Sequence, residues 1–210
     1  MDGSLAQTGK NLVMELEVVK LEHLPDTYTV HISLFRDVEN AAFLHEQLLA
    51  RNTDFEYAFI DASVVVSRLQ LLSAIFKAAN AAVNGALQTP NIHSETVASL
   101  SSSKNIADAY RRFGISPTTK DLLIAKITFP TEAEPQSAAS DSIAKHLHEN
   151  VKGRSMPVTD ENIAACTDMA KVRKYYKLNG ISWLEALKNT QAKRQQIESL
   201  VIGSMALRGV

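Results

Sequence analysis

Apolar and polar positions alternate near the start of the chain, and this alternation predicts two β-strands. In residues 28–35 four apolar side chains share one face, namely Tyr28, Val30, Ile32 and Leu34, as expected of a half-buried strand. Residues 15–21 alternate in the same way, and the intervening Leu-Pro-Asp sequence supplies turn residues. The two segments therefore predict a β-hairpin.

Three further segments have strand character. Residues 57–67 are rich in β-branched and aromatic side chains. Residues 121–129 are apolar on both faces in their first half, which is typical of a central strand, and Pro130 ends it. Residues 155–158 indicate an edge strand.

Helical spacing of apolar residues appears between these strands. Ser67 and Gln70 have the spacing of a capping box, which predicts a helix over residues 68–83. We expect its core-facing side chains to be Leu69, Leu72, Ile75, Phe76, Ala79 and Val83. Ser182 and Glu185 form a similar box, which predicts one long C-terminal helix.

Residues that favour N-terminal caps predict five other helices. The expected starts are Asp37, Thr89 before Pro90, Ser103 or a neighbouring serine, Asp141 (a short helix through Leu147), and Thr167 or Asp168. The first of these helices would turn its apolar side chains inward, namely Val38, Ala41, Leu44, Leu48 and Leu49. The second would bury Ile92, Val97 and Leu100.

Residues 101–114, SSSKNIADAYRRFG, predict an amphipathic helix. Its apolar face comprises Ile106, Ala109, Tyr110 and Phe113. Lys104, Asp108 and Arg112 have the spacing of a weak charge ladder. We expect Gly114 to end the helix in a left-handed conformation, with Ile115 packed back on Tyr110.

The order of these segments predicts an α+β fold with a single domain, in which a small, mostly antiparallel sheet packs against several helices. We expect a flexible N-terminal tail at 1–14 and a single domain over 15–210. The segment at 130–140 contains two prolines and few large apolar residues, so it predicts a flexible loop.

Composition narrows the function only slightly. The 210 residues are 45% apolar and 21% charged, with a net charge of −1, so contact with a nucleic acid requires a local basic patch. Cys166 is the single cysteine, which excludes an internal disulfide and favours a reducing compartment. No apolar run approaches the roughly 20 residues of a membrane span, and we expect no secretory signal and no membrane partner.

Candidate catalytic chemistry is weak. The sequence contains neither a G-x-x-x-x-G-K-[ST] nor a G-x-G-x-x-G motif. His146 and His148 would point to different helix faces, which argues against a metal site. A buried thiol is the favoured interpretation of Cys166, and a cap or turn ligand that of Asp61. We therefore expect no enzymatic activity, no metal and no cofactor.

Positive charge is concentrated near the C-terminus. Between residues 171 and 194, a single acid, Glu185, accompanies seven cations, namely Lys171, Arg173, Lys174, Lys177, Lys188, Lys193 and Arg194. Such a cluster forms either a solvated helix face or a phosphate-binding surface, and the former is commoner.

Several segments in order resemble the PRPK-binding protein (TPRKB) family, the kinase-binding small subunit of the KEOPS/EKC complex. They are LFRDVENA, AFIDASVVVSRLQLLSAIFKA, SETVASLSSSKNIADAYRRFGI, LLIAKI, VRKYYKL and the terminal LRGV, which is most similar to the fungal branch. The central serine-rich cap, Asn-Ile pair and Phe-Gly-Ile ending carry most of the resemblance.

The resemblance implies a non-catalytic subunit that binds and modulates the complex's atypical protein kinase, contacts other subunits indirectly, and helps recruit tRNA by its acceptor end for threonylcarbamoyl-adenosine modification. For kinase binding we expect Leu69, Ile75, Met205 and Leu207, because a stable interface needs an apolar centre. For tRNA binding we expect Lys104, Arg111 and Arg112, followed by Lys174 and Lys177.

The resemblance also implies a location in nucleus and cytoplasm and a connection with telomeres. A stand-alone RNA-binding module is the main alternative, and it would hold tRNA tightly without partners. An uncharacterised hydrolase or transferase is a third possibility, and it would require a pocket with perturbed titratable groups.

Overall fold

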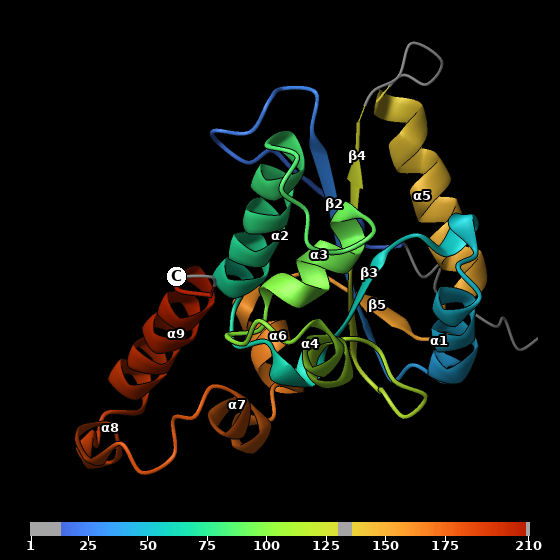
Figure 1. Ribbon diagram of the computed structural model, residues 1–210. Coiled ribbons are helices and arrows are strands. Elements are labelled where there is room, and N and C mark those ends of the chain that lie inside the picture. The colour runs from blue at the N-terminus through green and yellow to red at the C-terminus, as the bar shows by residue number, and fades with distance from the viewer. Residues whose placement is uncertain (1–13, 130–135, 209–210) are drawn as a thin grey trace, which may run out of the picture.

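The computed structural model describes residues 14–129 and 136–208 (Figure 1). The strands are β1 (Glu17–Val19), β2 (Thr29–Arg36), β3 (Ala58–Asp61), β4 (Leu122–Thr128) and β5 (Arg154–Met156). The helices are α1 (Ala41–Leu49), α2 (Arg68–Val83), α3 (Ile92–Ser99), α4 (Ile106–Phe113), α5 (Gln136–Asn150), α6 (Asp160–Cys166), α7 (Met169–Tyr175), α8 (Ser182–Ala186) and α9 (Thr190–Ala206). Two 3₁₀ turns, η1 (Thr53–Phe55) and η2 (Ala62–Val64), flank β3.

The strands of the described residues form one antiparallel sheet in the order β1-β2-β4-β3. β2 and β4 are central, as the apolar pattern of β4 predicts, and Leu34 of β2 pairs with Leu123 of β4. β1 pairs with the first half of β2 as the predicted hairpin, and β5 pairs with its second half. The expected α+β fold with a single domain is confirmed.

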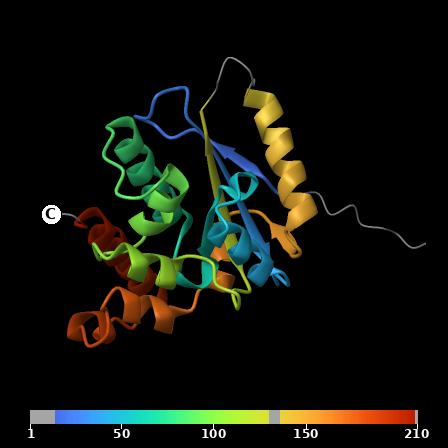
Figure 2. The same cartoon turned by 45° about the vertical axis from the view of Figure 1, so that its right-hand side comes forward.

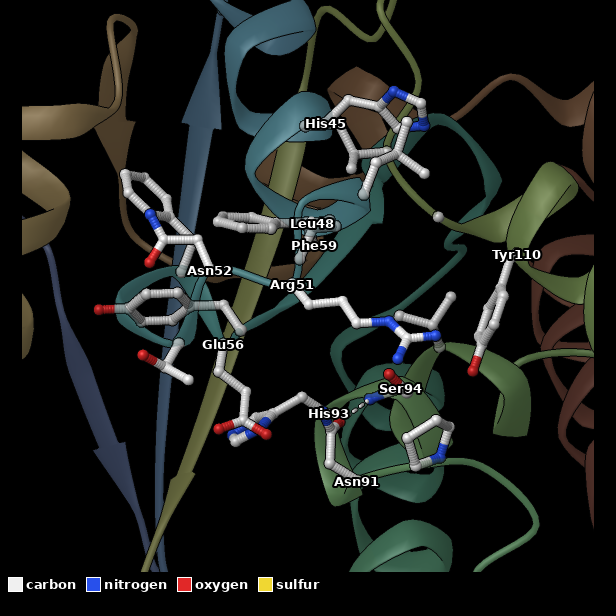
Figure 3. Close-up of a pocket in the computed structure, with 18 of the residues that line it drawn as sticks. His45, Leu48, Arg51, Asn52, Glu56, Phe59, Asn91, His93, Ser94 and Tyr110 are labelled. Carbon is white, nitrogen blue, oxygen red and sulfur yellow. Dashed lines mark hydrogen bonds between the residues drawn. The ribbon is translucent and has the colours of Figure 1, made fainter.

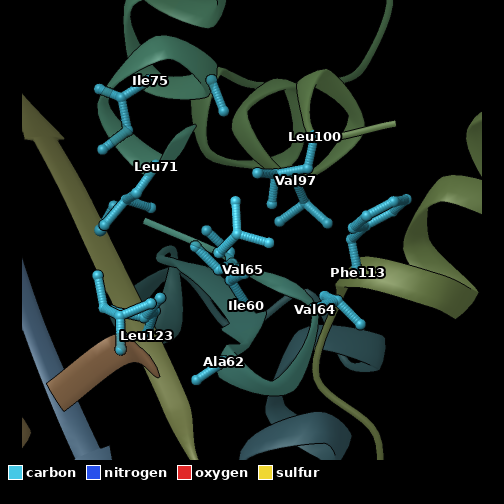
Figure 4. Close-up of a cluster of buried hydrophobic side chains, with 14 of the residues drawn as sticks. Ile60, Ala62, Val64, Val65, Leu71, Ile75, Val97, Leu100, Phe113 and Leu123 are labelled. Carbon is cyan, nitrogen blue, oxygen red and sulfur yellow. The ribbon is translucent and has the colours of Figure 1, made fainter. Parts of the chain in front are cut away.

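Helices cover both faces of the sheet (Figures 1 and 2). On one face, α2, α3 and the C-terminal helices bury Val30, Ile32 and Leu34 of β2, as the alternating pattern predicts. The centre of this core lies between α2, α3, α4 and the strands (Figure 4), where Phe113 and Leu71 are almost fully buried.

On the other face, α1 and α5 pack over a smaller core. It contains Phe35 and Ile124 from the sheet, Leu44 from α1, and Ile143 and Leu147 from α5. Because adjacent strand residues point to opposite faces, the apolar first half of β4 supplies side chains to both cores.

Most of the helices begin at polar caps, although several caps differ from those predicted. The Ser67 hydroxyl accepts from the Gln70 N–H at 3.1 Å, so the predicted start of α2 is confirmed, as is Asp168 for α7. Thr89 and Ser103 were the wrong residues, because Asn91 and Asn105 cap α3 and α4. Asparagine side chains satisfy orphan helix N–H groups as well as serine does.

Two predicted boundaries and one predicted core position in the first half of the chain are wrong. Asp37 has a φ of 56°, which an N-cap does not adopt, and α1 starts after Asn40. Leu49, at the last position of α1, is 70% exposed and not buried as predicted. The strand predicted at 57–67 ends at Asp61, because its carboxylate accepts from the Ser63 N–H and opens η2.

The C-terminal half differs in two ways. Asp141 does not begin a helix, because α5 already starts at Gln136. Residues 136–140 of the predicted loop are therefore helical, and its first part, 130–135, lies outside the described residues. Residues 1–13 of the predicted tail lie outside them as well. The predicted long C-terminal helix is two helices, α8 and α9. The expected Glu185 cap is absent, since its carboxylate pairs with Arg173 and Lys193 instead.

The face of α2 turned toward the core is also not the predicted one. Ile75 and Ala79 are buried as expected, together with Leu71, Ala74 and Ala78. However, Leu69, Phe76 and Val83 are 57%, 36% and 45% exposed. α2 is apolar on two sides, and only one of them packs on the sheet.

Candidate functional sites

A pocket of about 670 Å³ opens between the end of α1, the edge strand β3 and the helices α3 and α4 (Figure 3). Tyr57 and Phe59 line it from β3 and its approach, and Tyr110 and Arg111 line it from α4. Aromatic and cationic side chains thus face the same space, from segments far apart in the sequence.

The turn after α1 directs Arg51 into this space. Arg51 has a φ of 54°, in the left-handed region, and Asn52 then holds the chain by donating to Gln47 Oε1 at 2.8 Å and accepting from the Asp54 N–H at 3.1 Å. Figure 3 shows the Arg51 side chain extended toward Ser94 and Tyr110. Among the described residues Arg51 has no ion pair.

The two neighbouring arginines of α4 have different surroundings. Arg111 is 73% exposed at its side chain, contacts Asp108 and lines the pocket. Arg112 pairs with Asp108 at 2.8 Å and lies over the Tyr175 ring, with its guanidinium carbon 5.2 Å from the ring centroid. Of the predicted charge ladder only the Asp108–Arg112 pair forms: Lys104 makes no ion pair with the described residues, and Arg111 pairs with Asp108 instead. Of the two arginines only Arg111 reaches the pocket.

Gly114 ends α4 without the predicted left-handed cap, and Ile115 does not pack on Tyr110. The backbone of Gly114 is extended, with a φ of −77°, and the Ile115 N–H donates to the Phe59 carbonyl at 3.0 Å. Ile115 belongs to the α1–α5 core. This crossing of the β3 edge brings α4 against the pocket.

The remaining predicted tRNA-binding residues lie elsewhere. Lys104 is exposed before α4, and Lys174 and Lys177 are exposed at the end of α7; none of the three lines the pocket. Part of the C-terminal positive charge is neutralised, because Lys171 approaches Asp61 at 3.8 Å and Lys193 approaches Glu185 at 3.4 Å.

A second candidate surface is an exposed apolar stripe along α2, formed by Leu69, Phe76 and Val83, which we call the α2 stripe. The end of α9 lies beside α2 (Figure 1), where Lys77 Nζ of α2 donates to the Met205 carbonyl of α9 at 2.6 Å. Leu207, at this end, is 68% exposed.

The four predicted kinase-binding residues therefore divide into two groups. Leu69 and Leu207 are on the surface, whereas Ile75 and Met205 are 0% and 2% exposed in the core. The prediction omitted Phe76 and Val83 from the surface because their spacing also fits a buried face. It omitted Arg51 and the pocket because a pocket shared by four segments leaves no local pattern.

Nucleophilic or metal chemistry has little support in the described residues. The Cys166 thiol is buried, burial raises its pKa to about 11, and it donates to the Asn162 carbonyl at 3.3 Å, so it is a poor nucleophile. Asp61 is a turn ligand, as interpreted from the sequence. No group of three or more His, Cys, Asp or Glu side chains in 14–129 and 136–208 is arranged to hold a metal ion. Within the same ranges no helix has the length and apolar character to cross a membrane.

The fold and its two surfaces define a small α+β protein equipped for binding. A family model described as kinase binding protein CGI-121 matches residues 35–209, and the chain belongs to this family. The predicted family resemblance is thereby confirmed.

Similar curated proteins cover nearly the same length. The EKC/KEOPS complex subunit CGI121 of Gibberella zeae is 62% identical over 197 residues, which is 94% of this chain and 100% of that protein. The protein of the same name from Neurospora crassa is 45% identical, over 94% of this chain and 100% of its own length. The one from Schizosaccharomyces pombe is 30% identical, over 88% of this chain and 95% of its own length.

Proposed function

We propose that this chain is a non-catalytic subunit of an EKC/KEOPS complex, which binds and modulates the complex's atypical protein kinase and recruits tRNA by its acceptor end for threonylcarbamoyl-adenosine modification. Membership of the kinase-binding family and the names of the relatives, which are EKC/KEOPS complex subunits, support the complex. The pocket that combines aromatic rings with Arg51 and Arg111 supports the RNA contact. The expected locations are the nucleus and the cytoplasm.

For the kinase we propose the α2 stripe together with Leu207. Exposed large apolar side chains that lie along one helix are typical of the centre of a partner interface. Ile75 and Met205 would support this surface from beneath. Ile75 packs on the core side of α2, and the Met205 carbonyl accepts from Lys77, which holds the end of α9 beside α2.

The kinase proposal is tested by binding of the purified cognate kinase to the double variant Leu69→Ser, Phe76→Ser. Truncating two central apolar side chains is expected to raise the dissociation constant by about 100-fold or more. Leu49→Ser is the matched control, because Leu49 is 70% exposed on α1, outside the stripe. Equal kinase affinity of the double variant and the control would contradict the proposal.

For tRNA we propose that unpaired acceptor-end nucleotides enter the pocket. Proteins recognise single-stranded RNA by stacking bases on aromatic or guanidinium planes and by placing cations along the backbone. Tyr110 provides a ring, and Arg51 and Arg111 provide cations. The Tyr57 ring is buried, stacks on His146 and has Lys126 over it. Lys104, Arg112, Lys174 and Lys177 are proposed as peripheral phosphate contacts.

The tRNA proposal is tested with an intact tRNA and the same tRNA without its unpaired 3′ nucleotides. The wild-type protein should prefer the intact molecule, and Arg111→Glu should remove that preference, with binding that weakens as salt increases. Arg112→Glu is the matched variant, because Arg112 faces Tyr175 and should have the smaller effect. Equal binding of both RNAs by the wild type would refute the acceptor-end contact.

A further inference from the structure

One acid lines the pocket, which is unexpected for a site that holds a polyanion such as RNA. Among the described residues around the pocket, Glu56 is the only acid, beside the cations Arg51 and Arg111. Glu56 directly follows η1 and is partly exposed. Figure 3 shows its side chain extended, with the carboxylate at the end that points away from the turn.

The backbone at Glu56 is held on both sides. Its N–H donates to the Thr53 carbonyl at 3.2 Å, and its carbonyl accepts from Lys126 Nζ at 2.6 Å. The Tyr57 N–H then donates to the Phe55 carbonyl at 2.8 Å. The carboxylate itself makes no hydrogen bond or ion pair with the described residues. The protein therefore fixes the base of this side chain and leaves its charged end available to a ligand.

Arg51 and Glu56 leave the same turn but do not pair with each other. Figure 3 shows the guanidinium directed toward Ser94 and Tyr110 and the carboxylate directed to a different side of the space. The pocket therefore has a cationic side and a separate anionic group. The last nucleotide of an RNA strand has a matching polarity, because it carries a phosphate on its 5′ side and two neutral hydroxyls on its ribose.

The other polar groups of the pocket do not provide this polarity. Several are bonded within the protein or have a buried polar atom, namely Asn52, Tyr57, Asn91, His93, Tyr110 and Ser116. His45, Thr53 and Ser94 can both donate and accept, so they bond to a hydroxyl or a phosphate alike. The two arginines only donate, and an ionised carboxylate only accepts. Glu56 is therefore the group that distinguishes a hydroxyl from a phosphate.

We propose that the Glu56 carboxylate accepts hydrogen bonds from the 2′ and 3′ hydroxyls of the last ribose of an RNA strand, and that the pocket thereby selects RNA with a free 3′ end. This inference rests on the proposed binding of unpaired tRNA nucleotides in the pocket. The two oxygens of a carboxylate match the two adjacent donors of a ribose diol, and hydrogen bonds to a charged acceptor are strong. Arg51 and Arg111 then contact the phosphate on the 5′ side.

Glu56 discriminates by repulsion as well as by attraction. A nucleotide inside a strand, or one that ends in a phosphate, carries a negative charge on its 3′ oxygen, and this charge would lie against the carboxylate. Like charges brought together at an interface weaken binding strongly, and specificity commonly uses such a repulsive element. Glu56 is thus a specificity-determining residue for the end of the strand and not for its sequence.

The test measures the affinity of RNA minihelices that end in unpaired C-C-A and differ only at the last nucleotide. The wild type should bind a 3′-phosphate end about 10-fold or more weakly than a free end, and a terminal 2′-deoxyribose about 5-fold more weakly. A terminal purine without the amino group should bind like adenine. Glu56→Gln keeps the size and an acceptor but removes the charge, so it should bind the phosphorylated and the free end with similar affinity. Glu56→Ala should not distinguish the 2′-deoxy end from the unmodified one.

Asp54→Asn is the matched control. Asp54 is an exposed acid of η1 that does not line the pocket, so its removal changes the net charge equally and should leave the preference for a free end intact. If the wild type binds none of the RNAs, the proposed function itself fails. If it binds all of them equally, if affinity follows the base amino group, or if Asp54→Asn abolishes the preference as Glu56→Gln does, RNA binding stands and this inference is overturned.

Discussion

Gly114 shows how one residue can be required for a reason that its sequence context does not reveal. Its position after Phe113 predicts a left-handed helix end, yet its backbone is extended. The restriction is steric, since a Cβ at this position would lie 2.7 Å from the Tyr110 carbonyl oxygen. Only glycine allows α4 to turn directly onto the β3 edge.

Replacement of Gly114 by alanine should destabilise the fold. The close contact with the Tyr110 carbonyl oxygen forces the backbone to move, at a cost of about 1–3 kcal/mol in the free energy of unfolding. Gly203→Ala in α9 is the control, because nothing lies within 4 Å of its added Cβ, and it should stabilise the protein by up to about 1 kcal/mol. Urea denaturation of both variants measures the difference, and equal stabilities would argue against the steric explanation.

At the scale of elements, Gln70 ties the buried side of α2 to its neighbours. Its Oε1 accepts from the Val66 N–H at 2.7 Å, and its Nε2 donates to the Tyr176 hydroxyl at 2.8 Å. The hydroxyl in turn donates to the Leu100 carbonyl at 2.5 Å. This buried chain connects α2, the end of α7 and the end of α3, whereas the α2 stripe stays exposed.

Tyr176→Phe should therefore weaken the packing of three helices at once. It leaves the Gln70 amide and the Leu100 carbonyl without a buried partner, which should lower the free energy of unfolding by about 1–3 kcal/mol. Tyr175→Phe is the matched control, since among the described residues its hydroxyl makes no hydrogen bond and its ring contacts with Phe113 and Arg112 are retained. Similar denaturation midpoints for the two variants would show that the chain contributes little.

At the scale of the whole molecule, neutral histidines occupy positions on both sides of the sheet. His93 lies on the α2–α3 side, where its Nε2 accepts from the Ile127 N–H at 3.1 Å, whereas His31 bonds to Ser140 at 2.9 Å and His146 to the Tyr57 hydroxyl at 3.0 Å in the region of α5. Desolvation lowers the pKa of all three. The folded protein therefore binds fewer protons at these sites than the unfolded chain does in mildly acidic solution.

Acid should destabilise the protein in a range set by these histidines. Below the ordinary histidine pKa of about 6.5 the unfolded chain binds protons at these histidines, whereas the folded protein does not. The free energy of unfolding should consequently fall as pH decreases from about 6.5, by up to about 1.4 kcal/mol per pH unit for each such histidine. For His93 this continues toward its folded pKa of about 3.

Denaturation of the wild type and His93→Gln between pH 7 and pH 4 measures the His93 contribution. The variant should be less sensitive to acid by up to about 1.4 kcal/mol per pH unit, because the titrating ring is gone while an acceptor for Ile127 remains. Parallel pH profiles of the two proteins would show that His93 is not the group responsible.

The sequence by itself determined the family of this protein and the type and order of most of its helices and strands, although not all of their boundaries. Alternation predicted β1 and β2, continuous apolar residues predicted β4, and helical spacing predicted α2 and α4, because local side-chain periodicity reflects burial on one face or two. It also correctly identified Asp61 as a turn ligand and Cys166 as a buried thiol.

The tertiary structure alone decided the orientation of faces and the assembly of the pocket. α2 is apolar on two sides, so only its packing assigned Phe76 to the surface and Leu71 to the core. Arg51 and Arg111 are 60 positions apart in the chain and line the same space. His93 meets Ile127, 34 positions further along the chain, only in the fold. Spacing along the chain encodes contacts within an element, whereas sites formed between elements depend on long-range packing.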